Sequence, residues 1–188
     1  VDINNGEIRW LSKYHDHFLY KYRLNDIRNI NVRNSTPPIL KNGKLYVFPT
    51  DSEYLFIYNS INGDLQRMFP EIQSEFNMSE VIGVSENGEI FMNNEREIIA
   101  VQEDGNREIL WQTILPGIQQ KCTLTKKYIY STGINNQIYI INLKDGEFKI
   151  IKTSIPRNSY SYATIIDEKK LFGISSISNI GFTFSIIK

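Results

Sequence analysis

The chain has few of the residues on which several common classes of protein depend. Its 188 residues include one cysteine, Cys122, and two histidines. One cysteine cannot form an intrachain disulfide or a multi-cysteine metal site, and we expect Cys122 to pack as a small buried side chain. No apolar run approaches the roughly 20 residues of a membrane helix, and no signal peptide is evident at Val1. The sequence therefore predicts no membrane span and no disulfide framework.

Excess charge of either sign is also absent, since 21 basic residues balance 21 acidic ones. The balance is uneven along the chain, with net charges of +4 over residues 1–50, −10 over 51–110 and +6 over 111–188. Such a distribution can steer a charged partner, and the alternative is a solvated surface that keeps the protein soluble. A hydrophobic content of 41% with 12% aromatic residues is typical of a folded globular chain.

A repeated hairpin pattern dominates the remaining sequence. Residues 137–151 contain two apolar runs separated by Lys144-Asp145-Gly146. A glycine between two such runs is a strong hairpin signal, because it supplies the positive φ of a tight turn. The same pattern recurs around glycines 57, 42 and 41 residues apart, namely Gly6, Gly63, Gly105 and Gly146.

A second hairpin precedes each later copy, with turns at 42–43, 87–88, 126–127 and 168–169. Four short strands in about forty residues is the period of propeller blades such as those of WD40 repeats. We predict an all-β protein, one β-propeller domain over residues 1–188 with about four four-stranded blades. Complete units are expected over 39–69, 81–111 and 122–151, with three further strands near 161–166, 170–174 and 182–187.

Several strands are apolar on both faces, as in Leu45–Phe48, Tyr54–Tyr58 and Ile138–Ile141. Blades stacked face to face bury both sides of each sheet, which favours a propeller over the alternative, a two-sheet sandwich with solvated outer faces. A first strand ending at Trp10 would supply the fourth strand of the last blade and close the ring. The alternative is an open arc of a larger propeller.

Three segments resemble the repeats of the PQQ-like (quinoprotein-type) β-propellers. Val1–Trp10 has the Asp…Gly…Trp pattern of an outer hairpin, and Pro38–Val47 has the Asn-Gly-Lys pattern of an inner hairpin. The third segment, Trp111–Gly117, begins with the repeat tryptophan. The resemblance implies that Trp10 and Trp111 dock between neighbouring blades. It also suggests an extracytoplasmic location, periplasmic or luminal.

The family includes quinoprotein dehydrogenases and non-catalytic members, such as a barrel-assembly lipoprotein and luminal stress-sensing domains. Its enzymes carry a vicinal cysteine pair and a calcium site beside a catalytic aspartate. Here Cys122 has no neighbouring cysteine, and no matching acidic cluster is evident. The resemblance therefore implies the scaffold without catalytic residues or a cofactor, and a PQQ-dependent oxidoreductase is the less favoured alternative.

The long connection between Ser12 and Thr36 is the predicted partner-binding segment. Long loops on a rigid scaffold often carry function, and tyrosine and arginine often anchor interfaces. The candidate residues for a protein partner are Tyr14, His15, His17, Tyr20, Tyr22 and Arg23. The two histidines with Asp16 lack a third metal ligand, so we expect a polar loop and no metal site. Net neutrality also argues against nucleic acid.

Connections on the same face as that loop provide a second candidate surface. A ring of amide and charged groups there suits a sugar or another small ligand, although these are also ordinary turn residues. The candidate ligand-binding residues are Asp51, Glu53, Arg96, Asn135 and Asn136. The sequence thus favours a non-catalytic protein-interaction scaffold, with a small-ligand or carbohydrate-binding propeller as the alternative.

Overall fold

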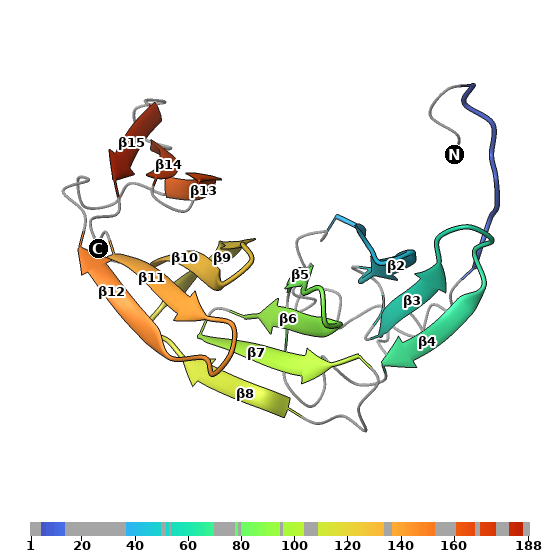
Figure 1. Ribbon diagram of the computed structural model, residues 1–188, viewed down its shortest axis with the longest axis horizontal. Coiled ribbons are helices and arrows are strands. Elements are labelled where there is room, and N and C mark those ends of the chain that lie inside the picture. The colour runs from blue at the N-terminus through green and yellow to red at the C-terminus, as the bar shows by residue number, and fades with distance from the viewer. Residues whose placement is uncertain are drawn as a thin grey trace, which may run out of the picture. The chain divides into compact units, whose positions relative to one another are not determined.

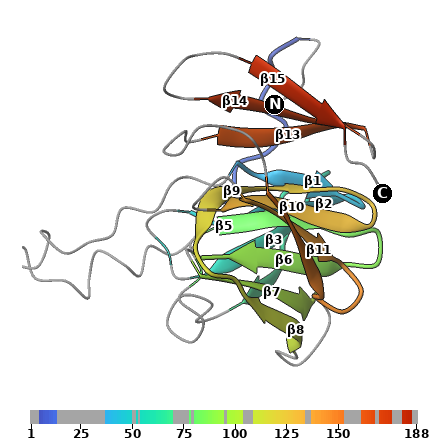
Figure 2. The ribbon, with the colours of Figure 1, turned by 90° about the vertical axis from the view of Figure 1, so that its left-hand side faces the viewer.

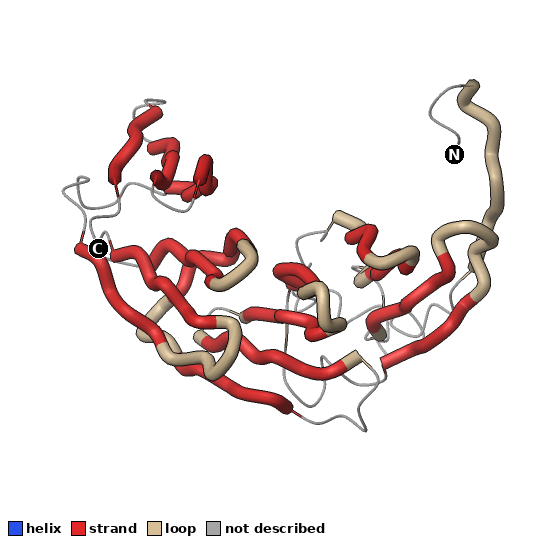
Figure 3. The backbone as a smooth tube through the Cα atoms, viewed as in Figure 1, coloured by secondary structure: helices blue, strands red, loops and turns tan. Residues whose placement is uncertain are grey.

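The computed structural model describes residues 5–13, 37–49, 52, 54–69, 78, 80–94, 96–103, 109–133, 137–152, 161–167, 170–175 and 181–185. For residues 118–121 and the last three of these ranges, only the backbone is described. Every regular element in these ranges is a β-strand, drawn in red in Figure 3. The described ranges contain no helix that could cross a membrane.

The strands form four antiparallel sheets, each hydrogen-bonded in chain order (Figure 1). The first sheet contains β1 (Ile39–Lys41), β2 (Lys44–Val47), β3 (Leu55–Asn59) and β4 (Leu65–Phe69). The second contains β5 (Glu80–Val84), β6 (Glu89–Asn93), β7 (Glu97–Gln102) and β8 (Ile109–Ile114). The third contains β9 (Ile118–Leu124), β10 (Tyr128–Gly133), β11 (Gln137–Asn142) and β12 (Phe148–Lys152), and the fourth contains β13 (Ser161–Asp167), β14 (Lys170–Ser175) and β15 (Gly181–Ser185). The predicted three full units and one three-stranded unit are confirmed.

The inner hairpin turn of the first sheet has the backbone geometry that its sequence predicts. Asn42 and Gly43 both have positive φ, 49° and 72°. Positive φ at both central residues matches the twist of the flanking strands, which is why Asn-Gly is favoured in such hairpins. This turn sets the register in which Leu40 lies opposite Leu45.

The second and third strands of the sheets form the core. All four side chains from Leu55 to Tyr58 on β3 are buried, as are those from Ile98 to Val101 on β7. Neighbouring residues of a strand point to opposite faces, so both faces of these sheets are covered. The prediction from the two-sided apolar runs is confirmed. A two-sheet sandwich would instead leave one face of each sheet solvated.

The fourth strands are more exposed than the middle strands, and β8 alternates between burial and exposure. On β8, Trp111 and Thr113 are buried while Leu110, Gln112 and Ile114 are exposed. Figure 2 shows β5, β6, β7 and β8 following one another across the second sheet, which puts β8 at its outer edge. One face of β8 packs inward and the other meets solvent, whereas β12 has no buried side chain.

Two expectations are corrected. Residues 5–13 are not in a strand, so the fourth strand predicted from Val1–Leu11 is missing from the part of the chain that is described. A strand requires a neighbour with which to exchange hydrogen bonds, and β13–β15 stay three-stranded. Cys122 is half-buried, because it lies on β9, the edge strand of its sheet.

The chain divides into two compact units, Val1–Glu86 and Asn87–Lys188. The boundary falls in the turn between β5 and β6, two strands of one sheet. One domain over residues 1–188 therefore stays a prediction. The units are described separately below.

Candidate functional site

In the second unit, Trp111 of β8 docks onto the turn between β11 and β12. Its indole N–H donates a hydrogen bond to the Leu143 carbonyl oxygen at 2.7 Å. The Thr113 hydroxyl donates to the Gly146 carbonyl oxygen at 2.6 Å. The Trp111 ring also lies 5.8 Å from that of Phe91 on β6. One face of the outer strand β8 is therefore fixed against the next sheet.

In the first unit, Trp10 makes the equivalent contact. Its indole N–H donates to the Ser60 carbonyl oxygen at 3.1 Å, and its ring stacks 6.5 Å from that of Tyr58. Ser60 follows Asn59 as Leu143 follows Asn142, and a glycine comes three residues later in both turns. Trp111 thus docks between neighbouring sheets, as the resemblance implied, whereas Trp10 docks on the first sheet from a segment that forms no described strand.

Burial also affects two tyrosines near these contacts. It raises the pKa of Tyr58 above its ordinary value of 10.0, and a hydrogen bond from Ser12 opposes part of that increase. Burial likewise raises the pKa of Tyr139. The Tyr139 hydroxyl lies 3.2 Å from the Pro116 carbonyl oxygen and 3.1 Å from Gln137 Oε1. Both phenols stay protonated and serve as packing groups.

The most regular polar structure among the candidate residues is the Arg96 turn, which we define as Asn94, Arg96 and Glu97 between β6 and β7. The Asn94 side-chain oxygen accepts the backbone N–H of Arg96 at 2.8 Å and that of Glu97 at 2.9 Å. The Asn94 amide nitrogen donates to Glu97 Oε1 at 2.7 Å. These bonds fix the backbone of the connection that carries Arg96.

A neighbouring connection supports the Arg96 turn. The backbone N–H of Leu115, directly after β8, donates to the Arg96 carbonyl oxygen at 2.7 Å. Gln112 on β8 donates to the second carboxylate oxygen of Glu97. The Glu97 carboxylate is therefore held by two side-chain amides. The Arg96 side chain is exposed and forms no ion pair with any residue that the structure describes.

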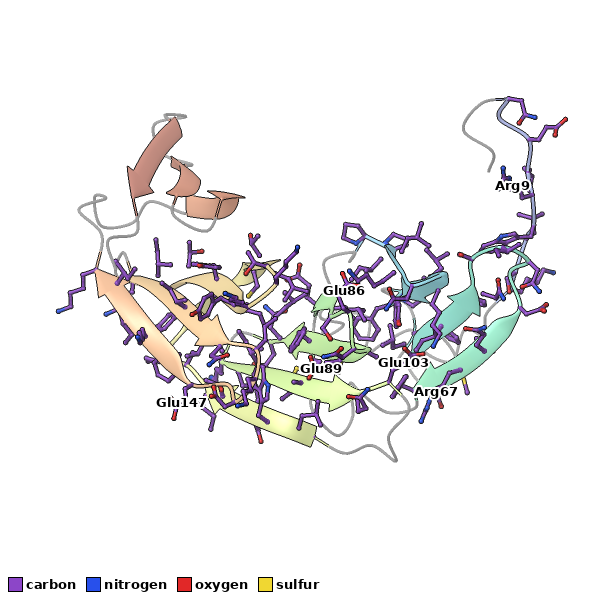
Figure 4. The ribbon with its side chains drawn as sticks, in the orientation of Figure 1. Arg9, Arg67, Glu86, Glu89, Glu103 and Glu147 are labelled. Carbon is purple, nitrogen blue, oxygen red and sulfur yellow. The ribbon has the colours of Figure 1, made fainter. Side chains whose placement is uncertain are left out.

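The opposite end of the β6–β7 pair is acidic. Glu89 begins β6, and Glu103 follows β7 directly; both are labelled in Figure 4. The Glu103 backbone N–H donates to the Gly88 carbonyl oxygen at 3.1 Å, which closes this end of the sheet. Arg96 and these two glutamates thus lie at opposite ends of the same hairpin.

Arg96 is the one candidate site residue within the described ranges. The other predicted ligand-binding residues, Asp51, Glu53, Asn135 and Asn136, lie outside them. So do all the predicted partner-binding residues, namely Tyr14, His15, His17, Tyr20, Tyr22 and Arg23. Within the described ranges, no three histidine, cysteine or acidic side chains form a cluster that could hold a metal ion.

Sequence reasoning did not single out a buried polar group next to Cys122. Ser131 on β10 lies opposite Cys122 on β9, and Asn93 of β6 donates to the Cys122 sulfur at 3.6 Å. Ser131 and Asn93 are fully buried. The sequence indicates a turn at Asn93-Asn94, but it does not indicate that β6, β9 and β10 meet at this polar group.

Comparisons with known proteins support the fold. No family model and no curated protein matches the chain. Among solved structures it is similar to BamB from Moraxella catarrhalis at 7% identity and a TM-score of 0.52, covering 82% of this chain and 50% of BamB. It is similar to apo AztD from Citrobacter koseri at 14% identity and a TM-score of 0.57, covering 80% and 46%. The computationally designed Ika4 protein gives 12% identity and a TM-score of 0.61, covering 97% and 99%.

BamB and AztD are β-propellers, so the repeated sheets define this chain as an all-β protein of the propeller class. BamB in particular has a PQQ-like propeller fold. The chain spans about half the length of BamB and of AztD. At these identities the likeness shows the fold alone.

Proposed function

We propose that this chain is a non-catalytic β-propeller of the PQQ-like repeat type that holds a protein partner through one loop face. The Arg96 turn carries the proposal, because it presents an exposed guanidinium on a backbone fixed by several hydrogen bonds. A fixed loop loses little conformational freedom on binding, so more of the contact energy contributes to affinity. Arginine is also enriched among the residues that dominate protein interfaces.

The chemistry around Arg96 suits recognition better than catalysis. The Glu97 carboxylate already accepts bonds from Asn94 and Gln112, so these contacts hold the turn and leave it little freedom to act as a base. The guanidinium is free to form bidentate hydrogen bonds with a carboxylate of the partner. The segment between Ser12 and Thr36 stays a second predicted contact for the partner, through its aromatic side chains.

The test compares three variants of the full chain. Arg96→Ala and deletion of Tyr14–Arg28 remove the two proposed contacts, and Lys149→Ala removes an exposed cation from the outer strand β12. Tagged proteins recover a specific partner from the native extract, and its affinity is then measured with purified components. We expect Arg96→Ala to weaken binding by roughly tenfold or more, since losing an interface anchor costs at least about 1.4 kcal/mol.

The deletion should abolish the complex, whereas Lys149→Ala should leave it intact. All three variants should keep the β-rich circular dichroism spectrum and nearly the same melting temperature. Equal binding by all of them would contradict the proposal. Calorimetric binding of a glycan or metal that Arg96→Ala removes would favour the small-ligand alternative. Visible-range absorbance and dye reduction with PQQ and calcium would favour an oxidoreductase.

A further inference from the structure

We propose that the fourth sheet binds residues 5–13 of a second copy of this chain as its missing outer strand. Two chains would then share blades, each completing the other. This inference concerns self-assembly, so it does not depend on the proposed partner-binding face.

The first supporting observation is the open edge of the fourth sheet. The other three sheets have four strands, and each ends in an outer strand, β4, β8 or β12. The fourth sheet ends at β15, and no described strand pairs with the outer edge of β15. An open edge exposes backbone N–H and C=O groups that readily pair with another chain. This edge therefore fits one more antiparallel strand.

The second observation concerns residues 5–13, which carry the features of an outer strand. Trp10 packs on the Gly63 turn as Trp111 packs on the Gly146 turn, and both indoles donate to the carbonyl next to an asparagine. Trp111 lies on β8, which pairs with β7. The segment around Trp10 forms no strand in the described structure. Its tryptophan packs on the first sheet of the same chain, but the segment pairs with no described strand.

The register of the proposed pairing follows from the repeat. Phe91 on β6 lies opposite Ala100 on β7, and Ala100 lies opposite Trp111 on β8. Phe91 comes three residues after the turn at 87–88, and Phe172 comes three residues after the turn predicted at 168–169. Phe172 lies opposite Thr183 on β15. Thr183 thus corresponds to Ala100.

Trp10 should therefore lie opposite Thr183. The β7–β8 register shifts between Ala100 and Val101, but it is regular on the other side of Trp111, where Ile99 lies opposite Gln112. In an antiparallel pair the partner number falls as the residue number rises, so Leu11 should lie opposite Phe182.

A second copy is the occupant that we infer, because the β15 edge and segment 5–13 belong to one chain and do not pair within its described residues. Two copies together would span about the length of BamB or AztD, of which this chain matches 50% and 46%, whereas it matches 99% of Ika4. Two copies related by a two-fold axis would pair each open β15 edge with the other copy's segment 5–13. Such a closed arrangement leaves neither edge free to extend into a fibre.

The experiment joins the proposed strands by a disulfide, with Cys122→Ser in every chain. One chain carries Leu11→Cys and the other Phe182→Cys, and the two are mixed, refolded together and oxidised. Directly opposed residues of an antiparallel pair lie about 4.5–5.5 Å apart at Cα, within the range of a disulfide. We expect a cross-linked species of twice the 21.9 kDa chain mass on a non-reducing gel.

The matched control replaces Leu11→Cys by Ser12→Cys, because successive side chains of a strand point to opposite faces. The control mixture should give at least tenfold less cross-linked product. A chain with both Leu11→Cys and Phe182→Cys shows whether the link joins two molecules or one. A link confined to one chain, no link in the mixture, or equal linking by the control would each overturn the proposal.

Discussion

At the scale of single residues, two tryptophans show how a short turn becomes a docking surface. In the turn after β11, the Asn142 carbonyl oxygen accepts the Gly146 N–H at 2.9 Å, and its side chain accepts the Lys144 N–H at 3.1 Å. These bonds close the turn while the Leu143 carbonyl remains available to the Trp111 indole. The turn after β3 repeats the arrangement, with the Gly63 N–H bonded to the Asn59 carbonyl at 2.9 Å.

Gly146→Ala tests this docking. A Cβ at position 146 would lie 2.6 Å from Trp111 Cε3 and 2.6 Å from the Thr113 hydroxyl oxygen, on a backbone with φ of +72°. We expect a loss of roughly 3 kcal/mol or more in the free energy of unfolding, because backbone strain of about 1–2 kcal/mol adds to displacement of the ring. Urea denaturation followed by tryptophan fluorescence measures it.

Gly43→Ala is the matched control, since Gly43 also has φ of +72° but no atom within 4 Å of the added Cβ. It should cost only the backbone term, about 1–2 kcal/mol. Equal losses for the two variants would show that the contact with Trp111 adds nothing.

At the scale of elements, burial separates the inner strands from the outer ones. Strands β6 and β7 are buried on both faces, whereas β8 and β12 expose apolar side chains such as Ile114 and Phe148. The middle strands have sheet partners on both sides and packed neighbours on both faces. The outer strands pair on one side and dock through selected residues.

Two isoleucines of adjacent strands test this difference. Ile98 on β7 is 0% exposed and Ile114 on β8 is 72% exposed. We expect Ile98→Ala to lower the free energy of unfolding by about 2–5 kcal/mol through lost burial and a cavity. Ile114→Ala should change it by no more than about 0.5 kcal/mol. Chemical denaturation measures both, and a large loss at Ile114 would show that the outer face of β8 is covered.

At the scale of the whole molecule, the count of strands per sheet governs assembly. Among the described residues, three sheets have four strands, the fourth has three, and segment 5–13 carries a docked tryptophan but pairs with no strand. An assembly that pairs the open edge of β15 with segment 5–13 of a second copy gives hydrogen-bond partners to backbone groups that would otherwise meet solvent.

Light scattering tests the assembly directly. We expect the unmodified chain to have about twice its 21.9 kDa mass. A chain without residues 1–11 should be monomeric, whereas deletion of Tyr14–Arg28 should leave the dimer intact. The two deletions remove adjacent segments, so the comparison separates loss of the strand from general damage. A monomeric mass for the unmodified chain would contradict the shared blade.

Much of the fold could be predicted because it depends on local features of the sequence. The Asn42-Gly43 turn and the apolar run from Leu55 to Tyr58 determine hairpins and two-sided strands within a few residues. The first segment was predicted as a strand because Gly6 and Trp10 follow the repeat. It is not one among the described residues, because a strand depends on a partner that the segment itself does not supply.

Less of the candidate site could be predicted, because it depends on contacts between distant residues. Arg96 was selected as a polar residue in a turn. The contacts that support it come from Gln112 on β8 and from Leu115 directly after β8, beyond the intervening strand β7. The group of Asn93, Cys122 and Ser131 likewise joins three strands.

The sequence by itself determined the all-β class, the forty-residue period, the turns and the strands buried on both faces. These follow from glycine at tight turns and from apolar side chains that exclude water, and both effects act over a few residues. Only the tertiary structure decided which carbonyl each tryptophan binds, which connection supports Arg96 and which sheet lacks a strand. Those outcomes depend on hydrogen bonds between segments far apart in the chain, and such bonds form only when neighbouring sheets bring their partners together.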